Sequence, residues 1–493
     1  MDRTADTAAN TSAAAGKSVA IIGAGITGLA AAVRLHDTLP HARLTVFESS
    51  GRPGGVLHTV RRDGFLVERS ADNFLTKQPW AADFCRRIGI SDQLLPTDAK
   101  RRKALVLKGG KIAPAPEGFV LMAPKRLGPI LRSPLLSWRG KLRLCCEPLV
   151  PSRRAAGDES VASFARRRLG DEVFARLVQP LLAGIYTADP TRLSMAATMP
   201  QFVEQEQRHG SLAWAAWRER AESPPPSENA EPHRDEQNAS GARYGLFLAP
   251  RGGMQQMIDA AAAALPRGCI QTGRRVTSIA PHGAGWLLAG DGGAPLGGFD
   301  ATIVTTPTHH AGPMLRAVDP KLDESLRAIE YAGCSVVCLG VRKCDVAAET
   351  PGFGFVVPSI EGRRIIAASF ASHKFPGRAP GDALLIRVFV GGALQPGLAE
   401  LPDDQLLQLV REELRELLGW RGEPLTEEIA RWPRGMPQYH VGHLDRVAQI
   451  ETLTADYAGL ELAGAAYRGV GIPQCIHSGQ QAADRVAAHL RRG

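Results

Sequence analysis

In the first part of the chain, two short apolar runs flank a segment with helical composition, and this order predicts a complete βαβ unit. Residues 18–22 (SVAII) and 43–47 (RLTVF) are short apolar runs with the β-branched residues that are typical of buried strands. Between them, residues 26–35 are rich in Ala and Leu, which predicts a helix. We therefore expect two parallel strands that are joined by a helical crossover.

Later in the chain the hydrophobic pattern changes twice. From about residue 120 to residue 220 the apolar spacing is helical and is interrupted by prolines. Residues 105–115 alternate and turn as a hairpin about Gly109-Gly110. Residues 403–418 form one more amphipathic helical pattern. Between the two helical stretches, strand candidates follow one another closely, at residues 335–341, 353–358, 364–371 and 383–390. This succession predicts a largely antiparallel sheet.

Together these patterns predict an α/β fold with three parts. We expect a Rossmann-type dinucleotide-binding domain, an inserted helical domain and a sheet-based substrate domain. Residues 222–244 are polar, rich in Pro and without apolar periodicity, so we expect a disordered linker there. The expected boundaries are 17–95, 245–310 and 440–493 for the first domain, 96–221 for the helical domain and 311–439 for the substrate domain.

A glycine fingerprint lies between the first strand and the first helix. In Gly23-Ala-Gly25-Ile-Thr-Gly28, Gly23 makes the tight turn, Gly25 lets the backbone approach a pyrophosphate, and Gly28 allows close packing of helix on strand. The helix starts at about Ile26 and Thr27, so its free N–H groups and positive dipole end face the phosphates.

Glu48 stands at the end of the second strand, about 20 residues after the last glycine, where a carboxylate accepts hydrogen bonds from a ribose. Just beyond it, Arg52, Gly54 and Gly55 offer a second cation and two unobstructed backbone amides to the same pyrophosphate. That extension resembles the flavoproteins of the amine-oxidase and protoporphyrinogen-oxidase group. We therefore expect non-covalent FAD as the cofactor.

A second glycine-rich turn lies near the C-terminus. Residues 460–463 predict a strand, Gly469, Val470 and Gly471 a turn, and Ile472-Pro473 the start of a helix, where Pro is well suited. Beside a flavin, the positive end of this helix would stabilise the anionic reduced ring. The alternative is an ordinary packing of a strand and a helix, without a ligand.

Composition and charge restrict the classes of binding partner that we expect for this protein. The chain has 493 residues and a net charge of +9, and residues 100–170 contain 17 Lys and Arg against 4 Asp and Glu. No nucleic-acid motif accompanies this basic stretch, whereas interspersed Leu, Pro and Trp favour peripheral contact with a membrane or with a flat carboxylate-bearing ligand. A solvated basic face is the alternative. Because no nucleic-acid motif is present, we expect no nucleic-acid partner.

The cysteine pattern indicates a reducing compartment, and the hydropathy argues against a membrane-spanning helix. The eight cysteines show no CxxC pair, which favours free thiols, no metal site and a cytoplasmic location, with the inner face of the membrane as a peripheral site. No apolar run reaches 18 residues, so no ordinary spanning helix is expected.

Longer motifs give the chain a resemblance to one family over residues 17–493. Besides the fingerprint and Glu48-Ser-Ser-Gly-Arg-Pro-Gly-Gly, the motifs are DGFLVE at residue 63, PLLAGIY at 180, RGGM at 251, MPQYHVGHL at 436 and AGAAYRGVGIP at 463. The chain resembles the FAD-dependent, oxygen-using protoporphyrinogen oxidases, including bacterial members that act on coproporphyrinogen III. It departs from them at Ser70-Ala71, where bacterial members usually have Gly-Pro.

The resemblance implies the oxidation of a porphyrinogen to a porphyrin in haem biosynthesis. Six electrons leave in three steps, each by hydride transfer from a meso carbon to the flavin N5, and O₂ is reduced to H₂O₂. Because the flavin performs this chemistry, no catalytic residue is assigned. The resemblance does not distinguish protoporphyrinogen IX from coproporphyrinogen III, and it leaves a homodimer open.

The resemblance also assigns binding residues. Val276 would touch the adenine through its backbone, and Trp432 would flank the flavin, with a purely structural tryptophan as the alternative. Arg102 would pair with a propionate, although it also fits an exposed charged run. The remaining positions are Gly184, in a turn against the macrocycle, and Phe353, Val356 and Phe389, on strands that sandwich the rings. An amine oxidase, a carotenoid desaturase and a non-catalytic flavin-binding protein are the alternatives.

Overall fold

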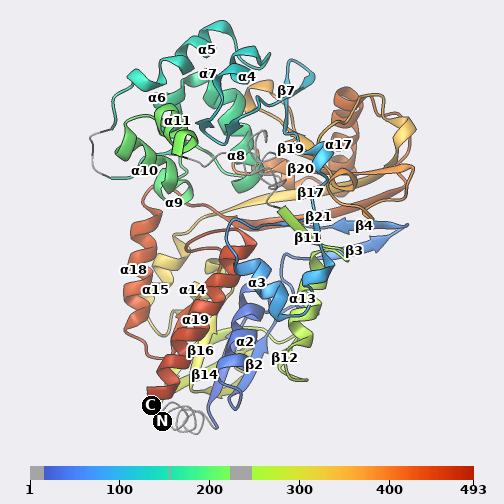
Figure 1. The fold of residues 1–493 in the computed structure, drawn as a ribbon. Helices are drawn as coiled ribbons and strands as arrows, with labels where there is room; N and C mark the ends of the chain where they lie inside the picture. The colour runs from blue at the N-terminus through green and yellow to red at the C-terminus, as the bar shows by residue number, and fades with distance from the viewer. Residues whose placement is uncertain (1–15, 154, 156, 223–246, 493) are drawn as a thin grey trace, which may run out of the picture.

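The computed structural model describes residues 16–222 and 247–492 except residues 154 and 156. Three parts are stacked in one column, with a nucleotide-binding part at one end, a broad sheet beside the middle and a helical part at the other end (Figure 1). The expected linker falls on residues 223–244, which lie outside the described residues, while Glu222 ends a helix. The α/β class predicted from the sequence is confirmed.

A parallel five-stranded sheet forms the centre of the nucleotide-binding part, in the order β12-β2-β1-β16-β22. The register pairs Val19 with Leu44 on one side and with Ala301 on the other. All side chains of β1 are buried, as expected for a strand that is covered on both faces. The strands are β1 (Ser18–Ile22), β2 (Arg43–Phe47), β12 (Ile270–Gln271), β16 (Ala301–Val304) and β22 (Leu460–Leu462).

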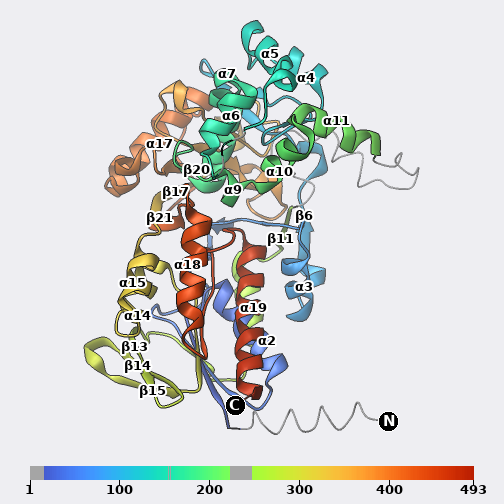
Figure 2. The same ribbon diagram turned by 90° about the vertical axis from the view of Figure 1, so that its left-hand side faces the viewer.

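Helices cover both faces of this sheet. One face carries α2 (Ile26–Thr38), α3 (Trp80–Arg87), α13 (Met254–Ala263) and α19 (Ile472–Arg492) in a single apolar core. The other face carries α14 (Thr308–Leu315), α15 (Pro320–Arg327), α18 (His443–Ala455) and the ribbon of β13 (Val276–His282), β14 (Gly285–Gly290) and β15 (Pro295–Phe299). Figure 2 shows that α18 and α19 both run lengthwise toward the substrate sheet.

A seven-stranded sheet forms the second part, in the order β21-β17-β20-β19-β18-β7-β8. Its strands are β21 (Thr426–Pro437), β17 (Tyr331–Arg342), β20 (Ala383–Gly391), β19 (Ala367–Phe370), β18 (Gly354–Val356), β7 (Leu105–Lys108) and β8 (Lys111–Pro114). Helix α17 (Asp403–Leu418) covers one face, and the hairpin of β3 (Thr59–Arg62) and β4 (Phe65–Glu68) packs on the other face. That hairpin connects the sheet to the nucleotide-binding part.

The hairpin β7–β8 lies in a different part from the one that the sequence indicated. Residues 105–114 were expected in the helical domain, yet β7 pairs in parallel with β18 through Leu105 and Phe355. The turn itself lies at Gly109-Gly110, as the sequence predicted. The first boundary of the helical domain therefore does not coincide with residue 96, because this edge of the sheet is completed by a segment distant in sequence.

Short helices build the third part. They are α4 (Leu127–Arg132), α5 (Trp138–Cys145), α6 (Val161–Leu169), α7 (Asp171–Val173), a π-helical turn (Phe174–Val178), α8 (Gln179–Tyr186), α9 (Met195–Thr198), α10 (Pro200–His209) and α11 (Leu212–Glu222). Short strands β5 (Phe74–Leu75), β6 (Leu94–Pro96) and β11 (Phe247–Pro250) form a separate small sheet, and β9 (Phe119–Val120) pairs with β10 (Ala123–Pro124).

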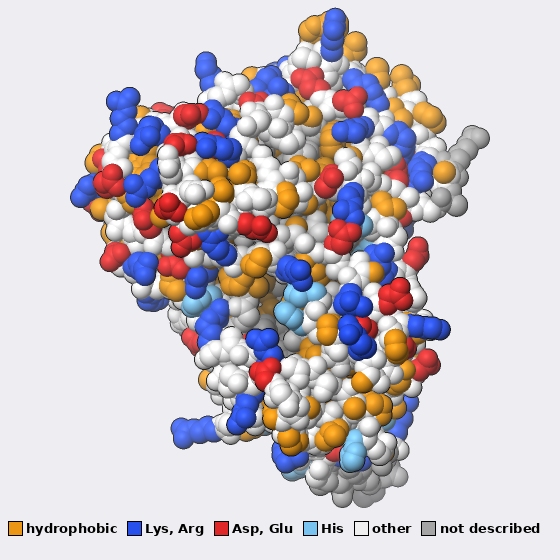
Figure 3. Space-filling model, turned by 180° about the vertical axis from the view of Figure 1, so that it is seen from behind, with side chains coloured by type: hydrophobic (Ala, Val, Ile, Leu, Met, Phe, Trp, Pro, Cys, Tyr) orange, Lys and Arg blue, Asp and Glu red, His pale blue; other side chains and the backbone are white. Residues whose placement is uncertain are grey.

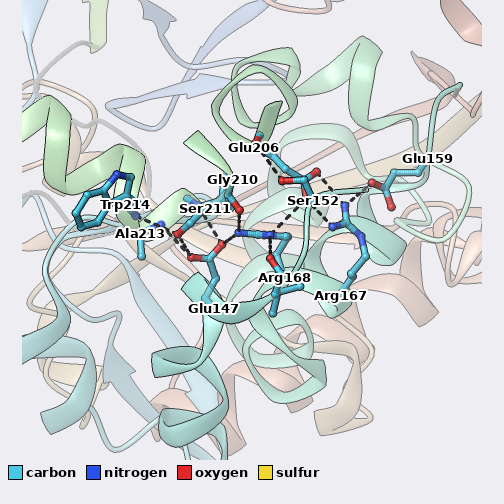
Figure 4. A network of polar contacts seen from close by, with 12 residues as sticks. Glu147, Ser152, Glu159, Arg167, Arg168, Glu206, Gly210, Ser211, Ala213 and Trp214 are labelled. Carbon is cyan, nitrogen blue, oxygen red and sulfur yellow. Dashed lines mark hydrogen bonds and ion pairs between the residues drawn. The ribbon is translucent and has the colours of Figure 1, made fainter. Parts of the chain in front are cut away.

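Buried charges hold these helices together (Figure 4). The guanidinium of Arg168 is fully buried, forms an ion pair with Glu147 and donates to the carbonyl oxygen of Gly210 at 2.8 Å. Glu147 in turn accepts hydrogen bonds from the N–H groups of Leu212 (3.0 Å) and Ala213 (3.1 Å), and so caps α11. Among the described helices, none is both long and apolar enough to cross a bilayer.

Candidate functional site

The first glycine turn has the shape that its sequence predicts. Gly23 has φ +103°, a region that favours glycine, and a Cβ on Gly28 would overlap the carbonyl oxygen of Gly23. A Cβ on Gly25 would meet open space. No side chain caps α2 and no acidic residue lies in its first turn, so the N–H groups near Ile26 and Thr27 are left for an anion.

Glu48 is held at the end of β2 by three internal donors. The N–H of Ala24 donates to Oε2 at 2.9 Å, and the N–H and hydroxyl of Ser50 both donate to Oε1 at 2.8 Å. A carboxylate offers about four acceptor sites, so capacity remains for a ribose hydroxyl. Glu48 therefore links the glycine turn to the loop after β2.

The loop after β2 differs from its expected role in two respects. The guanidinium of Arg52 donates to three carbonyl oxygens of its own loop, those of Pro53 (3.0 Å), Gly55 (2.7 Å) and Leu57 (3.0 Å). The N–H of Gly54 donates to Ala24 at 2.8 Å and is therefore not unobstructed. Arg52 therefore shapes the loop by satisfying its backbone carbonyl groups.

The loop nevertheless lies against the glycine turn. Gly25 and Gly54 form a parallel β-bridge, and a Cβ on Gly55 would lie 3.5 Å from the Cα of Gly25. Three predicted glycines of the cofactor site are thus adjacent, without side chains between them.

The C-terminal turn reaches the same place. A Cβ on Gly464 would lie 3.9 Å from the hydroxyl of Thr27, and a Cβ on Gly479 would overlap the carbonyl oxygen of Thr27. The turn itself contains Gly469, with φ +142°. The first turn of α2 therefore packs against the second turn of α19, although more than 400 residues separate the two helices in sequence.

The remaining residues of this turn are close to the helix start. The N–H of Cys475 donates to the carbonyl oxygen of Gly471 at 2.9 Å, and the Cys475 thiol contacts the carbonyl oxygen of Val470 at 3.9 Å. Ile472 begins α19 and packs on the core around α2. No acidic side chain lies in the first turn of α19.

Val276 and Trp432 lie on two different elements near the site. The N–H of Arg274 donates to the carbonyl oxygen of Glu48 at 2.8 Å, so the chain just before buried Val276 runs along the end of β2. Trp432, on β21, donates from its indole N–H to the carbonyl oxygen of Arg69 at 2.7 Å. Trp432 also lines a cavity of about 680 Å³, together with Tyr331, Gly333, Cys334, Gln438 and His440.

The molecule is visibly hollowed where its lower and upper parts meet. Figure 3 shows this hollow from behind, with histidine and basic side chains on its rim. A ligand bound between the parts would have an opening to solvent at this face.

Two predicted substrate residues meet between the helical part and the sheet. A Cβ on Gly184 would lie 3.8 Å from a methyl group of Val356. Gly184 was expected in a turn, but it lies inside α8, because the helix continues to Tyr186 before Thr187 adopts the left-handed conformation. The half-buried ring of Phe389 lies 5.4 Å from the guanidinium of Arg387.

Phe353 and Arg102 are placed differently from these residues. Phe353 precedes β18 and is 1% exposed, so its side chain lies in the interior rather than on a cavity wall. Arg102 donates to the hydroxyl of Thr97 at 3.3 Å and to its carbonyl oxygen at 3.1 Å. The N–H of Phe353 donates to the carbonyl oxygen of Lys103, the residue after Arg102, at 3.5 Å, so these two predicted substrate residues lie on neighbouring segments.

A buried carboxylate beside the site escaped the sequence analysis. Asp72 forms ion pairs with Lys374 and Arg387, each at 2.9 Å. Burial alone would raise the pKa of Asp72, but the two cations outweigh it and hold that pKa well below its usual range. The flanking turn had been noted only for its unusual Ser70-Ala71.

The motif RGGM at residue 251 has a structural explanation that the sequence did not provide. Buried Glu68 accepts a hydrogen bond from the N–H of Met254 at 2.8 Å, at the start of α13. Gly253 has φ +92°, and a Cβ there would clash with Thr59. The motif thus locks β4 to α13.

These residues fit FAD. The start of α2 has no side-chain cap, open space lies over Gly25, and Glu48 retains acceptor capacity beside them. The buried hydroxyl of Thr306, next to the Gly23 turn, has no hydrogen-bond partner among the described residues. Fold and site together define a flavin-type, dinucleotide-binding oxidoreductase.

Comparison with known proteins agrees with the assignment to a flavin-dependent oxidoreductase. The sequence profile of the flavin-containing amine oxidoreductases matches residues 26–487. The chain is 33% identical to coproporphyrinogen III oxidase of Bacillus subtilis, over 96% of this chain and 98% of that protein. It is 28% identical to protoporphyrinogen oxidase 2 of Arabidopsis thaliana, over 97% of this chain and 95% of that protein.

Solved structures extend the likeness. A provisionally assigned protoporphyrinogen oxidase from Exiguobacterium has a TM-score of 0.83 and 30% identity, over 96% of this chain and 99% of the other. Cyclohexylamine oxidase of Brevibacterium oxydans shares the fold, with a TM-score of 0.67 and 16% identity over 96% and 99% of the two chains. The chain belongs to the flavin-containing amine oxidoreductase family. It is an oxidoreductase whose cofactor is FAD.

Proposed function

We propose that this protein is an FAD-dependent, oxygen-using porphyrinogen oxidase of haem biosynthesis. The observation that carries the proposal is the junction of α2 and α19 at Thr27, Gly464 and Gly479, which supports a cofactor site that draws on both ends of the chain. Relatives named coproporphyrinogen III oxidase and protoporphyrinogen oxidase, aligned over nearly the whole chain, supply the reaction class.

In this proposal, the protein's own residues bind the cofactor and orient it. When bound, FAD supplies the redox chemistry, accepting hydride from the porphyrinogen in each of three steps and passing the electrons to O₂, which becomes H₂O₂. The first turn of α2 faces the pyrophosphate, and Glu48 accepts from a ribose hydroxyl. Val276 faces the adenine through its backbone, and Trp432 flanks the ring system.

The substrate side requires a flat apolar surface and a cation. Gly184 offers a helix surface without a side chain opposite Val356, a suitable wall for a macrocycle. Phe389 extends this apolar wall, whereas Phe353 supports it from the interior. Arg102, oriented by Thr97, pairs with a propionate carboxylate.

The test uses purified holoenzyme with chemically reduced coproporphyrinogen III and protoporphyrinogen IX. Porphyrin fluorescence should rise well above the rate without enzyme, with three H₂O₂ formed per porphyrin. Yellow protein without fluorescence gain would favour a non-catalytic flavoprotein, and H₂O₂ formation with simple amines would favour an amine oxidase. Comparing kcat/KM decides between the two porphyrinogens, and the bacterial relatives make coproporphyrinogen III the first to test.

We also propose that one end of the helical part binds a bilayer surface rich in anionic lipid. This apical surface consists of exposed Leu127, Leu131, Trp138 and Leu142, interleaved with basic Arg132, Arg139 and Lys141. Trp138 is 69% exposed and Arg139 lies 5.4 Å from its ring. Figure 3 shows apolar and basic side chains together at that end. Apolar side chains within a basic surface favour an interfacial site.

Sedimentation with vesicles tests the apical surface. Vesicles that contain phosphatidylglycerol should bind the protein more strongly than pure phosphatidylcholine vesicles, and Trp138→Ala with Leu142→Ala should abolish the difference. Leu287→Ala, on β14 at the opposite end of the molecule, is the matched control. If the double variant sediments with the phosphatidylglycerol vesicles as strongly as the wild type does, the membrane site is overturned. The homodimer and the cytoplasmic location stay predictions, for sedimentation velocity and cell fractionation.

A further inference from the structure

Tyr439 lies where the three parts of the molecule meet. It stands between the end of β21 and the start of α18, and so connects the substrate sheet to the nucleotide-binding part. Its carbonyl oxygen accepts a hydrogen bond from the N–H of Ser194 at 2.7 Å, in the helical part. The next residues continue this contact, because Leu193 and His440 form an antiparallel bridge.

The hydroxyl of Tyr439 holds the C-terminal cofactor turn at two points. It donates to the carbonyl oxygen of Ala465 at 2.5 Å and accepts from the N–H of Gly469 at 2.8 Å. A phenol has a single O–H, so both directions are fixed by the partners. Tyr439 is 1% exposed, and burial raises its pKa well above the usual value, which keeps the hydroxyl protonated.

His443 is the second residue that holds the turn before α19. Its ring stacks on Tyr439, with centroids 3.9 Å apart and 13° between the planes. Its Nε2 lies 2.9 Å from the carbonyl oxygen of Tyr467, and since a carbonyl can only accept, Nε2 carries the proton. Two stacked rings therefore fix Ala465, Tyr467 and Gly469, the residues that lead into α19.

We propose that Tyr439 is a positioning residue that sets the turn from Gly469 to Ile472, and with it the start of α19, against the flavin. The inference rests on the proposed function only for the identity of the substrate. Because Tyr439 is also bonded to Ser194, it fixes the cofactor turn relative to the helical part that borders the substrate. The amides of this turn act on the flavin only if they point correctly, since helix-end electrostatics fall off within one turn.

The test compares Tyr439→Phe with Tyr457→Phe. The first variant keeps the ring and loses the hydroxyl that anchors Ala465 and Gly469. The control loses a hydroxyl that donates to Val318 at 3.2 Å, outside the turn. In Tyr439→Phe we expect about tenfold weaker FAD binding, a changed visible flavin spectrum and a lower flavin midpoint potential, because the reduced anion loses stabilisation. Tyr457→Phe should match the wild type in all three.

Each outcome decides the proposal. If the FAD dissociation constant, spectrum and potential of Tyr439→Phe equal those of the wild type, Tyr439 does not position the turn. If Tyr439→Phe does not fold, His443→Phe, which keeps the stacking and loses the bond to Tyr467, must shift the potential in the same direction or the proposal is wrong. A wild type that binds FAD normally but oxidises no porphyrinogen would refute the proposed function and leave this test intact.

Discussion

Gly479, in the second turn of α19, lies against the carbonyl oxygen of Thr27 in α2 so closely that a single methyl group would overlap it. This contact packs the first turn of α2 against the second turn of α19, so that opposite ends of the chain are joined. In the proposed function, the N-terminal ends of both helices face one bound dinucleotide.

Gly479→Ala should loosen this junction. The added methyl group forces α2 and α19 apart, which costs about 1–3 kcal/mol of the free energy of unfolding and weakens FAD binding. Gly128→Ala is the control, because a Cβ at Gly128 in α4 meets open space and should be neutral or slightly stabilising. Thermal unfolding and FAD titration measure both effects, and equal behaviour of the two variants would contradict the close packing.

Glu48→Ala should weaken FAD binding more than it changes the fold. The variant loses the proposed acceptor for the ribose and also frees the N–H of Ala24. Losing a charged hydrogen bond of this kind corresponds to about 1.5–3 kcal/mol, or roughly ten- to a hundredfold in the FAD dissociation constant. Glu48→Gln should lie between the variant and the wild type. Unchanged FAD affinity in Glu48→Ala would remove Glu48 from the site.

The sequence predicted those parts of the fold whose cause is local. The βαβ unit follows from apolar runs and glycines within 31 residues, and α17 was expected at the bounds that it has, Asp403–Leu418, because its apolar stripe is continuous. The hairpin at Gly109-Gly110 was visible for the same reason. Its place in the sheet was not, since the pairing of Leu105 with Phe355 leaves no trace in either segment alone.

The candidate site shows the same division. The glycines and Glu48 can be recognised in the sequence by their spacing, whereas the internal hydrogen bonds of Arg52 depend on how its own loop closes. Tyr439 had been noted only as part of a motif, because its partners Ser194 and Gly469 are distant in sequence. Phe353 shows that a residue assigned by resemblance can sit one position outside its strand and be buried.

His443 makes stability depend on pH. Burial lowers the pKa of His443 to about 4, from an unfolded value near 6.5, so the folded state binds fewer protons. Stability is therefore complete above about pH 6.5 and falls as the pH drops toward 4, by up to roughly 3 kcal/mol from this residue. Urea unfolding at pH 7.5, 6 and 5 should show that slope, and His443→Phe should reduce it. A slope that is identical in both proteins would assign the effect to other groups.

Arg102→Ala should raise KM for the porphyrinogen about tenfold and change kcat little. A propionate contact made equally in the ground state and the transition state affects binding alone. The matched control is Arg101→Ala, which removes a neighbouring guanidinium that lies 3.7 Å from Asp98. If both variants keep the wild-type KM, Arg102 belongs to the charged surface and not to the substrate site.

The pair of Glu147 and Arg168 tests what holds the helical part together. Both side chains are fully buried, and Glu147 also accepts from the hydroxyl of Ser211 at 2.5 Å. Arg168→Met leaves a buried carboxylate without its cation and should cost about 3–5 kcal/mol of the free energy of unfolding, and Glu147→Gln should also destabilise. The double variant should be more stable than the sum of the single changes predicts, because no uncompensated charge remains. Additive losses in urea unfolding would show that the ion pair is not coupled and that the caps on α11 carry the stability instead.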